Sequence, residues 1–488
     1  MSLHIYNTKS RNKERFVPLE PGHVKMYVCG ITSYDFCHIG HARSALVFDM
    51  IVNYLRYSGY KVTYVRNFTD IDDKIINRAN ERNTTCAELA EKFIEEFYTD
   101  MNALGVGIPT IEPKATEHIQ DIIDIIQVLE NKGIAYQADG DVYFEVAKFK
   151  QYGALSGRNL EDLQAGARIS VNGKKKNPMD FALWKGSKPG EPAWDSPWGS
   201  GRPGWHIECS AMSRKYLGDS FDIHGGGEDL VFPHHENEAA QSEAASAKPF
   251  VTTWIHHAFV TISDEKMSKS LNNFLTIREV LKDYHPEALR LTVFSTHYRH
   301  PLDYSEDSLR EAMSGLTRLY NCMADCANLP AKHADGKVIS SKKEAEMMRT
   351  LSERFCAAMD NDFNTAQALG ILFEAIKILN RVRQTLPEKP SGADIDLLNN
   401  GAQTVTELAN IMGLLRLAPD TFTQNVQDRH LAAVSMTIEE VDQLIKERLE
   451  ARADKNWARA DEIRKQLLEK RIELKDSPDG STTWKVTM

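Results

Sequence analysis

The tetrapeptide HIGH, at residues 38–41, holds two imidazoles at a point where they could bind phosphate. It stands at the start of a stretch whose apolar residues recur at helical spacing, so His38 and His41 would lie near a helix N-terminus. Backbone N–H groups and the positive end of the helix dipole favour anions there. Gly40 has no Cβ, so a flat adenine or a ribose could approach the backbone closely. The motif therefore predicts a nucleotide site.

A second motif, KMSKS at residues 266–270, lies far along the chain on a loop that also contains Ser and Asn. Lys266 and Lys269 would bring mobile positive charge to a departing pyrophosphate. Each motif alone has a plainer interpretation, because a lone HxGH is usually a satisfied turn and a lone KMSKS a solvated loop. Together, and in this order, they predict an enzyme that activates a carboxylate with ATP.

The elements around HIGH predict a βαβ unit with a right-handed crossover. A strand is expected over residues 24–29, a helix over 41–57 and a second strand over 61–67. In parallel sheets, ligands bind beyond the carboxyl ends of the strands. Cys29 and Thr69 fall at these ends together with the two histidines.

The next part of the chain predicts an insertion into this sheet. Helices are expected at about 86–104 and 117–132, and a β-rich stretch at 141–146. Residues 172–205 are dense in Gly, Pro, Lys and Trp and indicate an irregular segment packed over the site. Alternating strands and helices resume over 209–261.

Beyond residue 304 the pattern becomes helical and continues to about residue 416. Residues 418–427 contain Pro, Thr, Asn and Gln and indicate a linker. Residues 437–471 predict a pair of helices with mixed charges, followed by a short tail that contains Trp484. Such a pair is in most proteins a solvated face, but basic positions next to an aromatic could also bind unpaired RNA bases.

Length and composition suit a soluble protein of about three domains. The chain has 488 residues, of which 42% are hydrophobic and 26% charged. No stretch approaches the ~20 apolar residues of a membrane span, and the N-terminus lacks a secretion signal. Its 7 scattered cysteines favour a reducing cytoplasm. The net charge of -10 argues that any RNA partner is held by local basic and aromatic patches.

A possible metal site involves His234 and Glu238, which lie on one face of a predicted helix and could converge on one ion. His235 is one residue off that face and is a weaker candidate. No spacing rule marks Cys29 and Cys209 as ligands, and on spacing alone buried inert thiols are the commoner interpretation. His234 could also be simply a residue at a helix N-terminus. The residues alone leave these alternatives open.

Six further segments narrow the interpretation. With the two motifs above, they make the chain similar to the class I aminoacyl-tRNA synthetases and, among them, to the cysteinyl-tRNA synthetases over nearly its whole length. These segments are NFTDIDDK (67–74), ATEHI (115–119), GWHIECS (204–210), HGGGEDL (224–230), FPHHENE (232–238) and MDNDFNTA (359–366).

The resemblance implies an α/β fold: a Rossmann-like parallel-sheet catalytic domain with an insertion, then an α-helical bundle and a small C-terminal anticodon-binding domain. We expect these parts at 1–304 (with the insertion at about 100–205), 305–420 and 428–488.

The resemblance also implies the site residues. One zinc ion per chain would be held by Cys29, Cys209, His234 and Glu238. The ATP-binding residues would be Gly40, Gly226, His38, His41 and Lys269, with both histidines, Lys266 and Lys269 acting in catalysis. The cysteine-binding residues would be Gly30, Thr69, Trp205 and Asp229. A thiolate is a far better zinc ligand than a hydroxyl, which would separate cysteine from serine without an editing domain.

The expected reaction joins L-cysteine to tRNA(Cys) in two steps, through cysteinyl-adenylate, with ATP and Mg²⁺. We expect a cytoplasmic monomer without membrane contact. One rival is a related ligase that transfers cysteine to an amino sugar, and another is a non-catalytic RNA-binding relative. The intact motifs oppose the second rival, and residues 437–484 oppose the first.

Overall fold

The computed structural model divides the chain into two compact units. Unit 1 comprises Met1–Thr261, Thr296–Leu302 and Cys356–Thr365, and unit 2 comprises Ile262–Ser295, Asp303–Phe355 and Ala366–Met488. The structure describes residues 2–158, 174–262, 265–266 (backbone only), 274–329, 336–477 and 481–486.

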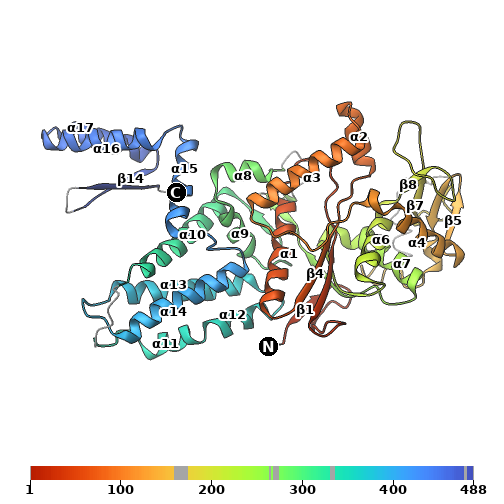
Figure 1. Ribbon diagram of the computed structural model, residues 1–488, viewed down its shortest axis with the longest axis horizontal. Helices are drawn as coiled ribbons and strands as arrows, with labels where there is room; N and C mark the ends of the chain where they lie inside the picture. Colours follow the sequence, from red (N-terminus) through yellow and green to blue (C-terminus); the bar gives the residue numbers. More distant parts are fainter. Residues whose placement is uncertain are drawn as a thin grey trace. The chain divides into compact units, whose positions relative to one another are not determined.

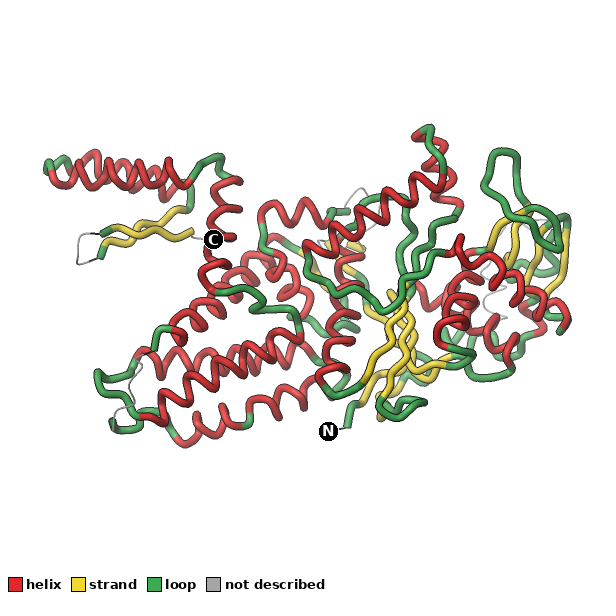
Figure 2. Tube along the Cα trace, viewed as in Figure 1, coloured by secondary structure: helices red, strands yellow, loops and turns green. Residues whose placement is uncertain are grey.

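A four-stranded parallel sheet in the order β10-β9-β3-β4 forms the centre of unit 1 (Figures 1 and 2). The direction in which the chain adds strands reverses between β3 and β9. The strand that follows β3 in sequence, β4, lies on one side of this pair, and the strand that follows β9, β10, lies on the other. Ligand crevices in open α/β sheets form at such a reversal, beyond the carboxyl ends of the strands. The strands are β3 (His23–Val28), β4 (Lys61–Arg66), β9 (Phe221–Gly227) and β10 (Val251–His257).

Helix α1 (Ile39–Tyr57) connects β3 to β4 and lies against the sheet (Figure 1). Most of its side chains are buried all round, as expected of a helix inside a domain rather than on its surface. It approaches β9 so closely that a Cβ at Gly225 would lie 2.3 Å from the ring of Phe48. The helix ends before Gly59, whose φ of +91° is open to glycine but strained for other residues. The predicted βαβ unit is confirmed.

The segment between β4 and β9 forms helices and a separate antiparallel sheet in the order β5-β6-β7-β8. The prediction that residues 172–205 are irregular was wrong, because two of these strands, β7 and β8, lie there. Buried Trp184 on β7 and the apolar face of α4 share one core with α6 and α7, which explains the tryptophan content. The elements are α2 (Asp73–Arg82), α3 (Cys86–Ala103), α4 (Ile119–Asn131), β5 (Ala135–Ala138), β6 (Asp141–Phe144), β7 (Phe181–Gly186), β8 (Gly201–Pro203) and α6 (Trp205–Leu217), while α7 (Glu236–Ser246) follows β9.

Two later segments of the chain return to unit 1 and are held by Asp362, which is fully buried. Its carboxylate accepts hydrogen bonds from the Tyr6 N–H at 2.8 Å, the Tyr298 hydroxyl at 2.7 Å and Arg299 Nε at 2.7 Å. Tyr6 lies on β1 (His4–Asn7), which pairs with β2 (Asn12–Arg15). Asp362 thus joins segments that are far apart in the sequence.

Unit 2 is mainly helical. Short strands β11 (Val260–Ile262), β12 (Glu265–Lys266) and β13 (Leu302–Tyr304) lie where the chain passes between the units. The helices are α8 (Ile277–Asp283), α9 (Pro286–Phe294), α10 (Glu306–Ala327), α11 (Lys342–Arg349), α12 (Leu351–Met359, whose end belongs to unit 1), α13 (Thr365–Gln384), α14 (Gly392–Ile411) and α15 (Pro419–Ala433).

The prediction of a linker at 418–427 was wrong, because these residues begin helix α15. Pro419 stands in the first turn, where its missing N–H costs nothing. Phe422 is buried and stacks on Tyr320 of α10 with ring centroids 3.9 Å apart. The polar residues of this segment thus form the solvated face of a helix that packs through its apolar side chains.

The C-terminal part confirms the predicted helix pair, with α16 (Ile438–Ala453) and α17 (Trp457–Glu469), and adds a hairpin of β14 (Ile472–Asp476) and β15 (Thr482–Val486). We call residues 438–486 the C-terminal module. Its core includes Val441, Ile463 and Leu474, and Leu431 of α15 packs into the same cluster.

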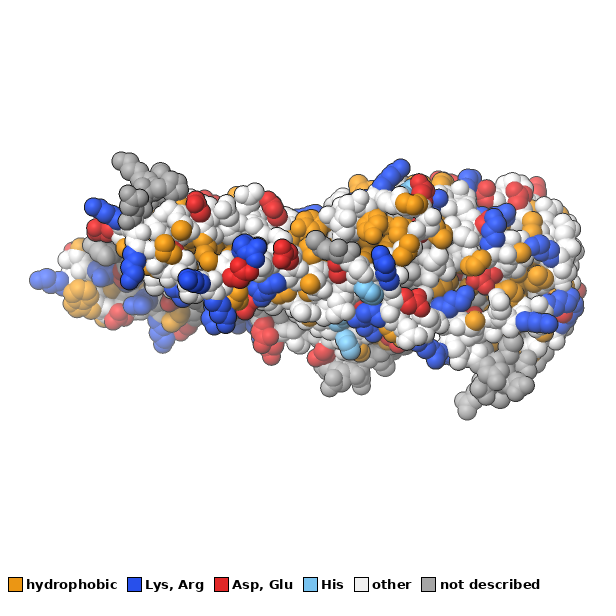
Figure 3. All heavy atoms as spheres, turned by 90° about the horizontal axis from the view of Figure 1, so that it is seen from below, with side chains coloured by type: hydrophobic (Ala, Val, Ile, Leu, Met, Phe, Trp, Pro, Cys, Tyr) orange, Lys and Arg blue, Asp and Glu red, His pale blue; other side chains and the backbone are white. Residues whose placement is uncertain are grey.

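Charges of both signs are interspersed on the face that Figure 3 shows. Among the described residues, no helix is both long and apolar enough to span a bilayer.

Candidate functional site

The predicted site residues that the structure describes gather around the carboxyl ends of β3 and β9. Cys29 follows β3 directly, HIGH opens the helix that follows, and Gly226 lies near the end of β9. This is the chain reversal of the parallel sheet, so the topology brings together residues that are far apart in the sequence.

The two histidines of HIGH cap helix α1. His38 Nδ1 accepts hydrogen bonds from the N–H groups of Gly40, at 3.1 Å, and His41, at 3.4 Å. In return, His41 Nδ1 accepts from the His38 N–H at 3.3 Å, and the two rings stack with centroids 3.7 Å apart. Because both Nδ1 atoms accept, Nε2 is the ring nitrogen that carries hydrogen in each neutral imidazole. Two N–H donors at a helix N-terminus suit a phosphate.

Cys29, Cys209, His234 and Glu238 form a tight cluster whose ligand atoms all lie within 4.8 Å of one another. The two sulfurs are 3.7 Å apart, and Cys209 Sγ is 3.7 Å from His234 Nε2. Glu238 Oε1 is 3.3 Å from Cys29 Sγ and 2.9 Å from His234 Nε2. The predicted approach of His234 and Glu238 across one helical turn is therefore present, and the cluster can hold a metal ion.

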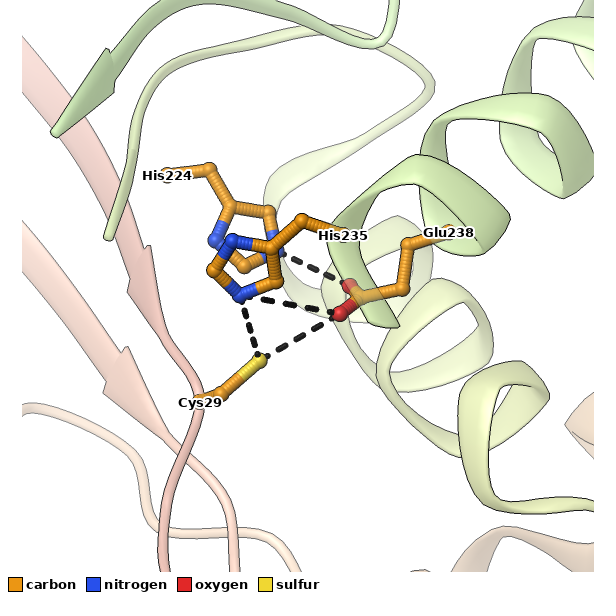
Figure 4. Close-up of side chains that lie close together, drawn as sticks. All are labelled: Cys29, His224, His235 and Glu238. Carbon is orange, nitrogen blue, oxygen red and sulfur yellow. Dashed lines mark hydrogen bonds and ion pairs between the residues drawn. The ribbon is translucent and has the colours of Figure 1, made fainter. Parts of the chain in front are cut away.

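A second group overlaps the first, with Cys29, His224, His235 and Glu238 (Figure 4). His235 Nε2 lies 3.3 Å from Cys29 Sγ and 3.9 Å from Glu238 Oε1. His224 Nε2 lies 2.9 Å from Glu238 Oε2, the oxygen that faces away from His234. Because both groups share Cys29 and Glu238, one ion at this place would select between two sets of ligands.

Further histidines orient the members of these groups. His206 Nδ1 is 2.9 Å from His234 Nδ1, so the Nε2 of His234 faces Cys209 and Glu238. His235 Nδ1 is likewise 2.7 Å from His256 Nε2. Partners of this kind fix the tautomer and the direction of a ligand ring.

Burial and neighbouring charges shift the pKa values in the first group strongly. Burial alone would lower the pKa of His234, but Glu238 and the Cys209 thiol outweigh it and raise this pKa to about 10. Burial would raise the pKa of Glu238, yet His224 and His234 hold it well below its usual range. A hydrogen bond from the Cys29 thiol, and then His234, lower the pKa of Cys209 to about 6. The cluster thus favours the ionised forms of Cys209 and Glu238 around a protonated His234. A divalent cation could take the place of that proton.

The predicted cysteine-binding residues Gly30 and Thr69 lie next to this cluster. A Cβ at Gly30 would sit 1.5 Å from the carbonyl oxygen of Asn67, so only glycine fits between the ends of β3 and β4. The Gly30 N–H donates to Asn67 Oδ1 at 2.9 Å. The Thr69 hydroxyl donates to Glu208 Oε2 at 3.1 Å, and both side chains are buried.

Trp205 and Asp229 lie on different elements. Trp205 begins α6 and is 37% exposed, and its ring covers His234 at a centroid distance of 4.3 Å. Because Cys209 lies four residues later on α6, it shares the helix face of Trp205. Asp229 is exposed in the turn after β9, beside Gly227. Gly226 pairs with His256 of β10 in the parallel sheet.

The side chains of the KMSKS lysines lie outside the part of the chain that the structure describes. Lys269 lies outside the described residues, and only the backbone of Lys266 is described, in β12. Their predicted roles at the pyrophosphate stay predictions.

Sequence reasoning assigned no role to His206 and His224 and treated His235 as a weaker candidate, whereas the structure brings His224 and His235 into the second group. His224 lies within strand β9, which is buried along almost its whole length, so no alternation of polar and apolar residues marks the histidine as part of a site. His235 lies directly before α7, after a segment whose backbone is kinked at Phe232, and its Nε2 comes to 3.3 Å from Cys29 Sγ.

Comparison with known families finds three matches along the chain. Residues 15–314 match the family described as tRNA synthetases class I (C) catalytic domain, and residues 354–416 match the DALR domain. Residues 438–484 match the cysteinyl-tRNA ligase anticodon binding domain.

Several relatives are similar over their whole length. A cysteine–tRNA ligase of Desulfotalea psychrophila is 60% identical over 486 residues, which cover 100% of this chain and 99% of the relative. A cysteine–tRNA ligase of Geobacter metallireducens is 57% identical over 488 residues, with 100% of both chains covered.

Solved structures show the fold. Methionyl-tRNA synthetase of Mycobacterium tuberculosis, in complex with methionyl-adenylate, superimposes with a TM-score of 0.58 at 14% identity, over 86% of this chain and 94% of that one. A putative arginyl-tRNA synthetase of Campylobacter jejuni gives 0.55 at 13% identity, over 80% and 93%.

Proposed function

The chain belongs to the cysteine–tRNA ligase family of class I aminoacyl-tRNA synthetases, and from this premise we propose that it activates L-cysteine with ATP and transfers it to tRNA(Cys). The amino-acid specificity is argued from the cluster of Cys29, Cys209, His234 and Glu238, in which Cys29 is half-buried and the other three are buried. The match of residues 438–484 to an anticodon-binding domain supports tRNA as the acceptor and disfavours an amino sugar.

We propose that the metal is zinc and that Cys29, Cys209, His234 and Glu238 hold it. Two thiols favour a borderline-soft ion over magnesium or calcium. Two sulfurs on a tetrahedral zinc with Zn–S bonds of ~2.3 Å stand about 3.8 Å apart, and the two here are 3.7 Å apart. When bound, zinc supplies a Lewis acid that prefers a substrate thiolate to a hydroxyl.

The alternative group, with His224 and His235, offers one thiol instead of two. In addition, His224 already binds the Glu238 oxygen that points away from Cys29. His224 is therefore placed to orient the Glu238 carboxylate from behind, which is how ligand carboxylates are commonly held.

The chain's own groups then perform the chemistry by positioning. Nε2–H groups of His38 and His41, with the N-terminus of α1, would bind ATP phosphates as the carboxylate of cysteine attacks the α-phosphate. Thr69 and Asp229 would receive the ammonium group, and Trp205 would cover the side-chain pocket. Lys266 and Lys269 would stabilise the leaving pyrophosphate, and Mg²⁺ would accompany ATP. A ribose hydroxyl at the tRNA 3′ end then displaces AMP.

ATP–pyrophosphate exchange with each amino acid in turn tests this proposal directly. Exchange should depend on cysteine and be orders of magnitude weaker with serine. Aminoacylation of tRNA(Cys) should follow, and zinc analysis of the same preparation should give about one ion per chain. Cysteine-dependent exchange without tRNA charging would reopen the small-molecule ligase, and equal exchange with serine would exclude thiolate selection.

A further inference from the structure

Arg43 is a buried charge in the second turn of α1, two residues after HIGH. Its side chain is almost fully covered, at 1% exposure. Burial lowers the pKa of Arg43 to about 10, against the opposing effect of Glu228, so the guanidinium stays charged at neutral pH. No carboxylate forms an ion pair with Arg43 among the residues that the structure describes. A buried charge of this kind is costly unless its hydrogen bonds are needed.

Within the described ranges, the acceptors of the guanidinium are all backbone carbonyls. Nη1 donates to the Phe259 carbonyl at 2.5 Å, and Nη2 donates to the carbonyls of Tyr298, at 3.0 Å, and His300. These acceptors lie on two chain segments, 258–259 and 298–302, that also bond to each other. The Ala258 N–H donates to the Tyr298 carbonyl at 2.9 Å, and the Leu302 N–H donates to the Phe259 carbonyl at 3.0 Å.

These two segments are the stems of one excursion of the chain. Residues 262–295 leave unit 1 after the first stem and return into the second. The predicted KMSKS motif, at 266–270, lies within this excursion. One planar, forked guanidinium therefore ties the helix that begins with HIGH to both ends of the segment that carries the other motif.

The second stem is also held from its other side. The Tyr298 hydroxyl donates to Asp362 Oδ1 and Arg299 Nε donates to Asp362 Oδ2, both at 2.7 Å. Tyr298 thus stands between Arg43, which binds its carbonyl, and Asp362, which binds its hydroxyl.

We propose that Arg43 is a positioning residue for adenylate formation, which sets the register of both stems of the excursion 262–295 against the HIGH helix. This inference rests on the proposed function, because its kinetic readout is ATP–pyrophosphate exchange. A lysine at this position keeps the charge but has a single nitrogen, so it cannot hold both stems as a guanidinium does.

The test compares Arg43→Lys with Arg448→Lys. Arg448 is a suitable control because it is also buried, at 4% exposure, and uses both Nη atoms, which donate to Asp476 at 2.8 Å. It lies on α16, outside the excursion 262–295. Arg43→Lys should lower kcat of exchange by roughly tenfold to a hundredfold, since small misplacements of reacting groups have effects of that size. KM for cysteine should change by less than about twofold. Amide hydrogens of Ala258 and Leu302 should exchange faster.

Arg448→Lys should lower thermal stability but leave kcat of exchange by the folded enzyme unchanged, because no tRNA takes part in that step. An unchanged kcat in Arg43→Lys would overturn the proposal, as would equal losses of kcat in both variants. Should Arg43→Lys not fold, Asp362→Asn weakens the same stem from its other side. This variant should likewise lower kcat of exchange and leave KM for cysteine nearly unchanged. If the unmodified enzyme shows no cysteine-dependent exchange, the proposed function fails, while the amide exchange at Ala258 and Leu302 still decides whether Arg43 holds the stems.

Discussion

At the residue scale, Glu238 divides its two carboxylate oxygens between different partners. Oε1 faces Cys29 Sγ at 3.3 Å and His234 Nε2 at 2.9 Å, and Oε2 meets His224 Nε2 at 2.9 Å. A carboxylate held by one oxygen from behind presents the other in a fixed direction. His224 would therefore contribute to metal affinity without being a ligand itself.

Replacing a thiol ligand should test the metal site. Cys209→Ser should weaken zinc retention, because a hydroxyl is a poorer ligand than a thiolate, and should reduce cysteine-dependent exchange. Elemental analysis after dialysis against a chelator, together with exchange assays, provides the measurement. Packing alone distinguishes such similar substrates by only about 1–3 kcal/mol, so discrimination against serine should shrink toward that range.

Cys322→Ser is the matched control, because Cys322 is equally buried but lies on α10 outside the cluster. It should retain zinc and exchange activity. Retention of zinc by Cys209→Ser, or activation of cysteine by zinc-free enzyme, would contradict the proposed ligand set.

At the element scale, the sequence predicted correctly those helices and strands that are marked by the spacing of nearby apolar residues. Helix α1 and strands β3 and β4 came from apolar periodicity and from the glycine that ends the helix. The same reasoning failed at α15, where polar residues suggested a linker. The helix is stabilised instead by one buried ring, Phe422, stacked on a tyrosine about a hundred residues away, which no local window contains.

Lys269 of the KMSKS motif is predicted to stabilise the leaving pyrophosphate. Lys269→Ala should reduce the rate of adenylate formation by roughly 2–4 kcal/mol of transition-state stabilisation, with little change in cysteine binding. Pre-steady-state exchange kinetics measure the rate, and equilibrium cysteine binding is followed in parallel. Lys248→Ala, at a lysine that pairs with Asp219 on the surface, is the control. Wild-type kinetics in Lys269→Ala would assign the pyrophosphate role to other residues.

In the C-terminal module, the exposed aromatic is Trp457 rather than Trp484. Trp457 begins α17 and is 59% exposed, whereas Trp484 pairs with Leu474 in the hairpin and packs partly against the core. Stacking on an unpaired base needs an accessible ring face. Sequence reasoning named only the tail aromatic Trp484 as a ring that could stack, because the exposure of Trp457 cannot be inferred from its neighbours in the sequence.

Trp457→Ala should therefore weaken tRNA binding by about 1–3 kcal/mol, the usual contribution of one aromatic–base stack. It should leave cysteine-dependent exchange unchanged, because no tRNA takes part in that step. Filter binding and charging at varied tRNA concentration measure the effect. Trp457→Phe, which keeps a ring, should recover most of the affinity, and normal affinity in Trp457→Ala would exclude stacking at this position.

At the scale of the whole molecule, the candidate metal site depends on topology that local pattern does not carry. Cys29 follows β3, whereas Cys209 lies on α6, and only the folded sheet brings their sulfurs within 3.7 Å. The pair of His234 and Glu238 was predictable because both lie on one helical turn. The cysteines entered the prediction through resemblance alone.

Removing the C-terminal module should separate the two steps of the reaction. A chain that ends after Met436 keeps α15 and its Phe422 contact, so cysteine-dependent exchange should persist. Charging of tRNA should fall sharply, through weaker tRNA binding with a shallower dependence on salt. Aminoacylation at matched salt is the measurement. Equal charging by both chains would show that the module does not recognise tRNA.

Unit 1 is built from three separate segments of the chain, so its folding during synthesis must wait for the last of them. Its last segment, Cys356–Thr365, supplies the Asp362 that binds Tyr6 and Tyr298, so an emerging chain that has reached only Thr261 cannot yet complete this unit. At translation speeds of about 5–20 residues per second, the missing segments follow only after several seconds. Nascent unit 1 therefore presents an unfinished surface to the ribosome and its chaperones during that interval, and it can be completed only after residues 262–295 and 303–355 of unit 2 have been synthesised.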